Sequence, residues 1–99
     1  MKCIRTDLEH ELRLQIAGAL DALTARDLRP IVDEVVVAKP KRVTVDLEAL
    51  TLLDSSGVGA LVSLFKRVKA DGGQVVVVGA HDQPLAVLKV LKLDRVFGL

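Results

Sequence analysis

The sequence predicts an α/β fold with a mixed sheet, in which strands and helices follow the order β β α β α β α, with a short strand at the end. Three observations support this. Apolar and polar residues alternate near the N-terminus, apolar residues recur at helical spacing in three later segments, and QVVVVG contains an unbroken β-branched run. Because each helix lies between strands, the later strands should be parallel with right-handed crossovers, while the first two form an antiparallel edge hairpin.

Two strands are expected at the N-terminal end. The first covers residues 2–6, and a turn follows it at residues 7–10. The second has one face in water, since polar residues separate its apolar ones, which are Leu12, Leu14 and Ile16. Gly18 and Asp21 break this alternation.

The first helix is expected around residues 28–36, where apolar residues lie at i, i+3, i+4, i+7 and i+8. Two residues are possible N-caps of this helix. Thr24 is a suitable N-cap, but Pro30 would then lie in the second turn, where it removes a backbone donor. Asp27 as the cap places Pro30 in the first turn, and a kinked start is the intermediate solution.

The second half of the chain predicts two more strands and two more helices. The third strand alternates over residues 43–47, after which LTLLD leads into the second helix. Residues 74–78 are expected in the sheet centre, because an unbroken apolar run is typical of a strand buried on both faces. Asp82 is the expected cap of the third helix, with Pro84 in its first turn. RVFGL is expected to return to extended structure.

Composition restricts the class of protein. The 99 residues, 51% of them hydrophobic, fit one domain over residues 1–99. A net charge of +1 and 2% aromatic residues provide neither the basic surface nor the stacking side chains of a nucleic-acid-binding protein. The lone Cys3 excludes a disulfide framework, and no apolar run approaches the roughly 18 residues of a membrane span. We expect a cytoplasmic protein without a membrane segment, metal or cofactor.

The main candidate site is the segment DSSGVG. Asp54, Ser55 and Ser56 lie between the end of a strand and the start of a helix, where α/β folds usually hold functional residues. An N-cap, which contributes about 1 kcal/mol, accounts for one polar residue there. It does not account for three together, followed by Gly57 and Gly59. Small residues at this point leave the helix start open to an approaching surface.

Catalysis and nucleotide binding are poorly supported. The glycines match neither the Walker A loop nor the dinucleotide fingerprint. A serine nucleophile needs a base, and the histidines, His10 and His81, fall in a predicted turn and a predicted loop. Asp46 and Glu48 fit solvent-facing or capping roles, and Cys3 fits a small buried hydrophobe. We predict no catalytic residue, and an enzyme is the least favoured class.

The chain resembles the STAS domains of bacterial anti-sigma factor antagonists. The resemblance covers residues 12–99. It rests chiefly on G-x-L-D at residues 18–21, D-S-S-G at residues 54–57 and the G-G-x-hydrophobic strand that begins at Gly72. The fold that it implies agrees with the order of elements predicted above.

The resemblance also implies a function. In that family the second serine of D-S-S-G, here Ser56, is the phosphoacceptor, and the aspartate of G-x-L-D, here Asp21, lies beside it. The unphosphorylated antagonist binds a cognate anti-sigma factor, a serine kinase of the histidine-kinase-like ATPase superfamily, and frees its client. Phosphorylation ends the binding, and a PP2C-type phosphatase restores it. The residues expected on the partner-binding surface are Asp21, Thr24, Asp54, Ser55, Gly57 and Val58.

One alternative keeps the same fold without the modification. The chain would then be a STAS scaffold or a subunit of a larger complex, with the serines acting only as caps. Because relatives usually continue through another strand and helix, we also expect an apolar patch or an oligomer contact on one side of the sheet. The residues expected in the core are Leu61, Phe65, Val76 and Leu88.

Overall fold

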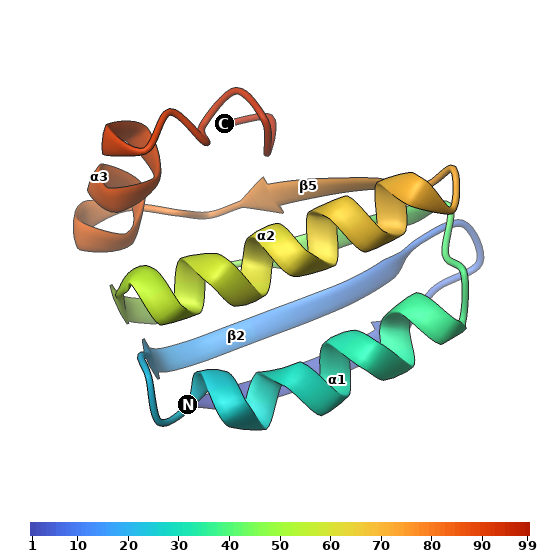
Figure 1. Ribbon diagram of the computed structural model, residues 1–99, viewed down its shortest axis with the longest axis horizontal. Coiled ribbons are helices and arrows are strands. Elements are labelled where there is room, and N and C mark those ends of the chain that lie inside the picture. The colour runs from blue at the N-terminus through green and yellow to red at the C-terminus, as the bar shows by residue number, and fades with distance from the viewer.

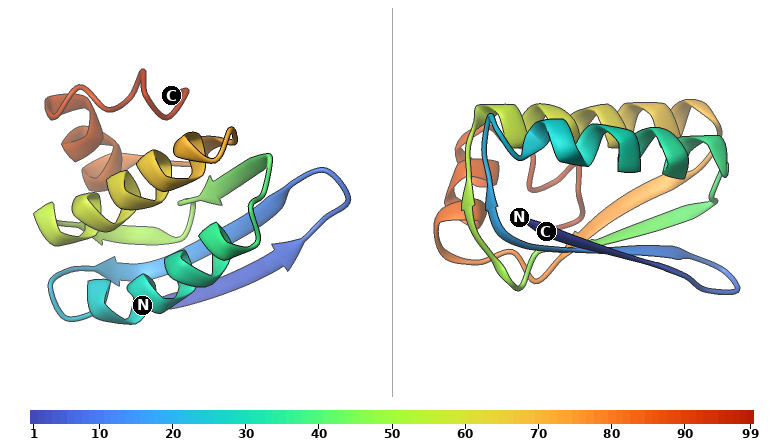
Figure 2. Two further views of the ribbon diagram at one scale, coloured as in Figure 1. Left: turned by 45° about the vertical axis from the view of Figure 1, so that its right-hand side comes forward. Right: turned by 90° about the horizontal axis from the view of Figure 1, so that it is seen from below.

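Two helices, α1 (Ala25–Val37) and α2 (Ser55–Ala70), lie side by side over one face of a five-stranded sheet in the computed structural model of residues 1–99 (Figure 1). The strands are β1 (Lys2–Asp7), β2 (Leu12–Leu20), β3 (Arg42–Asp46), β4 (Leu50–Leu53) and β5 (Gln74–Val78). A third helix, α3 (Asp82–Val90), packs near β4 at the end of the sheet. Figure 2 shows that α1 and α2 cover the same face. None of the helices combines the length and the apolar composition that crossing a membrane requires.

The sheet is mixed, as predicted. β1 and β2 form the expected antiparallel hairpin, and β5 runs parallel to β3. β2 has two successive parallel neighbours, because β3 pairs with residues 12–15 and β4 pairs with residues 18–20. The order of strands is β1-β2-β3-β5, with β4 beside β2. The functional consequence is that β2 and β4 end next to each other.

Two features of the strands at this edge were not predicted. β2 continues through Gly18 to Leu20, because the glycine adopts a φ of 87° and takes up a register shift. Residues 50–53 do not only connect the third strand to the second helix. They form β4, whose pairing with β2 is extended by a hydrogen bond of 3.0 Å from Gly18 N to Ala49 O.

The predicted central position of β5 is wrong. β5 lies at the sheet edge, where Val75 and Val77 are buried but Val78 is exposed. The segment after α3 covers its outer side, with Val77 N donating to Phe97 O at 2.9 Å. Residues 94–98 form turns instead of the expected last strand. An unbroken apolar run therefore reflects a covered edge here, and not a central strand.

The hydrophobic core lies between the sheet and the helices. Leu61 and Leu88 are buried, as predicted, with exposed fractions of 1% and 0%. Phe65 and Val76 are only half-buried, so these two predictions are wrong. Phe65 lies at the margin of the core, where the fully buried Phe97 packs edge-to-face against its ring at 5.7 Å.

The helix starts follow from local hydrogen bonds. α1 begins after Thr24, the first of the two open starts, so Pro30 lies in its second turn. α3 has His81 at the N-cap position, and Asp82, the predicted cap, is its first residue with a φ of 51°. The Asp82 carboxylate bonds to the imidazole of His81 and not to the helix. Large apolar side chains are exposed at this end of the chain, namely Val90, Leu91, Val96 and Leu99; an oligomer contact there stays a prediction.

Candidate functional site

The candidate site is the edge of the sheet at which β2 and β4 end and α2 begins. Asp54 N donates to Leu20 O at 3.2 Å, which is the last bond joining the two strands. The chain then enters α2 directly after β4 and the loop of residues 21–24 directly after β2. Asp21 and Asp54 each follow the last residue of a strand, so both lie at this edge.

Asp54 caps α2. Its backbone is extended, with a φ of −110°, and its Oδ1 accepts a hydrogen bond of 3.0 Å from Gly57 N. This bond satisfies one of the N–H groups that a helix start leaves without an intrahelical partner. The cap is thus the aspartate, and neither serine hydroxyl is used for it. Ser55 is exposed and Ser56 is half-buried in the first turn.

The two glycines after the serines differ in role. A Cβ at position 57 would lie 2.7 Å from Leu20 O and 2.8 Å from Leu53 Cδ1, so glycine lets α2 start directly against the strand ends. A Cβ at Gly59 would meet nothing within 4 Å. Gly57 therefore positions the helix, while Gly59 leaves its surface open.

One part of the predicted binding surface needs correction. Gly57 and Val58 are buried, and a Cβ at Gly57 would meet the strand ends beneath the helix. Both residues therefore contribute little to the exposed surface. The other predicted residues, Asp21, Thr24, Asp54 and Ser55, are half-buried or exposed.

Reciprocal hydrogen bonds between Asp21 and Thr24 hold the loop that follows β2. Asp21 Oδ1 accepts from the backbone N–H groups of Leu23 and Thr24, each at 3.0 Å. The Thr24 hydroxyl accepts from Asp21 N and donates to Ala19 O, each at 2.9 Å, so it does not cap α1. The Thr24 N–H group is the main cause that lowers the pKa of the Asp21 carboxyl. The loop thus fixes an anion at the end of β2.

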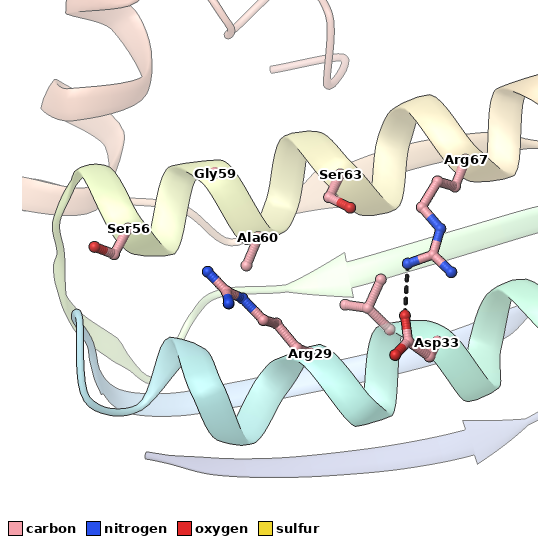
Figure 3. A pocket seen from close by; sticks show the side chains of 8 residues that line it. Arg29, Asp33, Ser56, Gly59, Ala60, Ser63 and Arg67 are labelled. Atoms are coloured by element: carbon pink, nitrogen blue, oxygen red, sulfur yellow. Dashed lines mark hydrogen bonds and ion pairs between the residues drawn. The ribbon is translucent and has the colours of Figure 1, made fainter.

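A groove runs between α1 and α2 and reaches Ser56 (Figure 3). Its volume is about 430 Å³. The lining residues are Arg29, Val32, Asp33, Ser56, Gly59, Ala60, Ser63 and Arg67. Sequence analysis did not identify this groove or Arg29. The signal that could have shown it is the run of small residues at i, i+3, i+4 and i+7 of α2, starting at Ser56.

Charges in the groove are unevenly paired. Arg67 Nη1 lies 2.6 Å from Asp33 Oδ1 and forms an ion pair between the two helices. Arg29 forms no ion pair, and Figure 3 shows its guanidinium pointing from α1 toward the first turns of α2. A cation without a carboxylate partner thus lies at the end of the groove nearer Ser56.

Side chains of α3 fasten the end of β4. The amide of Gln83 accepts from Leu53 N and donates to Leu53 O, both at 2.8 Å, so it pairs with the strand as a neighbouring backbone would. His81 Nε2 lies 2.7 Å from Glu48 O, and this bond is the main cause that raises the pKa of His81. The hydrogen bonds of the histidine anchor the helix, and none of them joins it to a serine.

The remaining candidate residues have structural roles. Asp46 accepts from Glu48 N at 3.0 Å and pairs with Arg13 at 3.1 Å, which fits the second of its two predicted roles, solvent-facing or capping. His10 is exposed in the turn after β1. Cys3 is half-buried, and its burial raises the pKa of the thiol. No cluster of three or more metal-binding side chains is found.

Comparison with known proteins gives a consistent result. The model of the STAS domain family matches residues 4–99. A STAS-domain containing protein of Pseudomonas aeruginosa is 29% identical over 89 residues, which are 90% of this chain and 87% of the relative. The anti-sigma-B factor antagonist of Listeria monocytogenes is 24% identical over 93 residues, which are 94% and 81% of the two chains.

Solved structures show the same fold. An anti-sigma factor antagonist from Mycobacterium paratuberculosis has a TM-score of 0.85 at 23% identity, covering 97% of this chain and 81% of its own. The Bacillus cell fate determinant SpoIIAA in its phosphorylated form has a TM-score of 0.78 at 16% identity, covering 96% and 87%. Its unphosphorylated form has a TM-score of 0.76 at 17% identity, covering 93% and 83%.

Proposed function

The chain belongs to the STAS domain family, and we propose that it is an anti-sigma factor antagonist that binds and releases a partner protein under the control of phosphorylation. A relative that is similar in sequence and a solved structure with a similar fold both carry the name of anti-sigma factor antagonist. The observation that supports the proposal best is that Asp54, and not a serine, caps the start of α2. Asp54 supplies the cap, so the hydroxyl of Ser56 has no structural hydrogen bond to give up when it is modified.

Ser56 is the phosphorylation site in this proposal. Its Oγ attacks the γ-phosphorus of ATP held by the partner kinase, the bond from that phosphorus to the β,γ-bridging oxygen breaks, and ADP leaves. The hydroxyl proton passes to a base of the kinase. The phosphate adds about −1.5 to −2 charges at neutral pH, at a helix end whose N–H groups and dipole favour an anion. The fold therefore tolerates the modification.

The modification changes the surface and not the core. The dianion joins two carboxylates, Asp54 and Asp21, at one edge of the sheet, which repels or sterically excludes a partner packed against the small residues there. A loss of about 3 to 4 kcal/mol of binding free energy lowers affinity by two to three decades. Such a change is enough for a switch controlled by phosphorylation.

The partners follow from the same scheme. The unphosphorylated chain binds a cytoplasmic anti-sigma factor with the fold of histidine-kinase-like ATPases and frees its client. A PP2C-type phosphatase hydrolyses the phosphoserine and restores binding. The chain is the substrate of both enzymes and performs no catalysis itself.

Intact-mass spectrometry tests the proposal. The chain is incubated with ATP and the kinase-like protein encoded beside its gene, then mapped by peptide digestion and passed over a sizing column. We expect one phosphate on Ser56 and loss of the complex. Ser55→Ala is the matched control and should be phosphorylated like the parent, whereas Ser56→Ala should stay unmodified and bound. A complex that forms without any modification would favour the scaffold alternative.

A further inference from the structure

The groove between α1 and α2 contains one arginine without an ion-pair partner, Arg29, and it lies close to the end of the groove where Ser56 is found. Of its charged lining residues, Arg67 and Asp33 satisfy each other at 2.6 Å. Arg29 lines the same groove with an exposed side chain and no ion-pair partner. Its guanidinium is thus available to an anion that enters the groove.

The residues between Arg29 and Ser56 are small and leave the space between these two side chains open. The α2 surface next to Ser56 consists of Gly59 and Ala60, and a Cβ added at Gly59 would touch nothing within 4 Å. In Figure 3 the Arg29 side chain extends from α1 toward this part of α2. Ser63 lies farther along the groove, beyond Ala60.

We infer that Arg29 is the phosphate-binding residue of the switch: the guanidinium of Arg29 binds the phosphate of phosphorylated Ser56 across the end of the groove. This inference rests on the proposed phosphorylation of Ser56. The planar guanidinium donates two parallel hydrogen bonds to phosphate oxygens, a geometry that lysine does not offer. The phosphate then bridges α1 and α2 and fills the end of the groove.

Other groups at the site are less suited to this role. Arg67 lies eleven residues along α2 from Ser56, about 16.5 Å at 1.5 Å per residue, and it already forms an ion pair with Asp33. Gly57 N is used by the Asp54 cap. The carboxylates of Asp54 and Asp21 repel the phosphate. Arg29 is therefore the side chain of the groove that can bind the phosphate at this edge.

Phosphorus NMR on protein with phosphoserine incorporated at position 56 during translation tests the inference. The second ionisation of a phosphoserine has a pKa of about 6, and a nearby cation lowers it because it favours the dianion. We expect Arg29→Ala to raise the phosphate pKa by about 0.5 to 1 unit. Arg95→Ala is the control, since Arg95 is an exposed arginine in the turns after α3 that does not line the groove, and it should change the pKa by less than about 0.2 unit.

A second readout reports direct contact. The Nε–H signal of Arg29 should move downfield on phosphorylation, while that of Arg95 stays in place. Equal phosphate titrations of the two alanine variants, or an unmoved Arg29 signal, would overturn the inference. Loss of partner binding by unphosphorylated Arg29→Ala with an unchanged phosphate titration would also overturn it, because the guanidinium would then contact the partner. The phosphate is installed without a kinase, so a failure of the proposed function, no kinase modification of Ser56, is a separate result.

Discussion

The two ends of α2 are both closely packed but present different surfaces. At the first end Gly57 approaches Leu20 O, and at the last end Gly73 approaches Pro40 O, where an added Cβ would lie only 2.4 Å away. The last end is closed by backbone hydrogen bonds, such as Gly73 N to Val68 O at 2.9 Å. The first end instead has a free serine hydroxyl above its close contact. The first end can therefore change its surface charge without losing the fold. The packing beneath it is tight, and no hydrogen bond that holds the fold depends on the serine hydroxyl.

Gly73→Ala should have the largest effect on stability. Its Cβ would meet a backbone carbonyl, which cannot move aside as a side chain can, so we expect the free energy of unfolding to fall by about 3 kcal/mol. Chemical denaturation measures this. Affinity for the partner, measured well below the thermal midpoint, should equal that of the parent. A loss of affinity would contradict the separation of the two ends.

Gly57→Ala should affect both properties. The Cβ would push α2 away from the ends of β2 and β4, which we expect to cost about 2 kcal/mol of stability and to weaken partner binding. Gly59→Ala is the matched control on the same helix. It should stabilise the fold by about 0.5 to 1 kcal/mol, because alanine restricts the unfolded chain more than glycine and meets no steric contact here. Equal stabilities for the two variants would contradict the assigned role of Gly57.

Asp54→Ala removes the cap at the first end. We expect a loss of about 1 kcal/mol in the free energy of unfolding, because Gly57 N loses its acceptor. Asp54→Asn keeps an acceptor oxygen and should lose less. If Ser55→Ala or Ser56→Ala costs as much as Asp54→Ala, a serine provides the cap and the hydroxyl is not free for modification.

Local signals account for what could be predicted at this site. The cap, the helix and the position of Ser56 follow from a few neighbouring residues, DSSG and the apolar stripe after it. β4 is four residues long and without alternation, so only its pairing with β2 identifies it as a strand. The groove and Arg29 depend on how α1 lies beside α2, which no local pattern encodes. The edge position of β5 depends likewise on the distant Phe97.

Asp21→Asn should have the smallest effect, and it depends on pH. Hydrogen bonds from Thr24 and Leu23 lower the pKa of Asp21 below its ordinary value of 3.8, so the stabilisation is present above that value and is lost as pH falls through the folded-state pKa. The difference in thermal midpoint between parent and variant should therefore be greatest near pH 7 and shrink below about pH 4. Asp27→Asn, whose carboxylate accepts none of these bonds, is the control. A difference that stays constant with pH would contradict this origin.

The central claim is that a charge on Ser56 controls binding without altering the fold. It is tested most directly by titrating the partner with three forms of the chain: unmodified, phosphorylated at Ser56 and Ser56→Ala, with the thermal midpoint of each recorded alongside. We predict that the phosphate raises the Kd by about two to three decades, that Ser56→Ala binds like the unmodified chain, and that the three midpoints nearly coincide. A phosphorylated chain that binds as tightly as the unmodified one, or that loses binding only together with its thermal stability, would contradict the account.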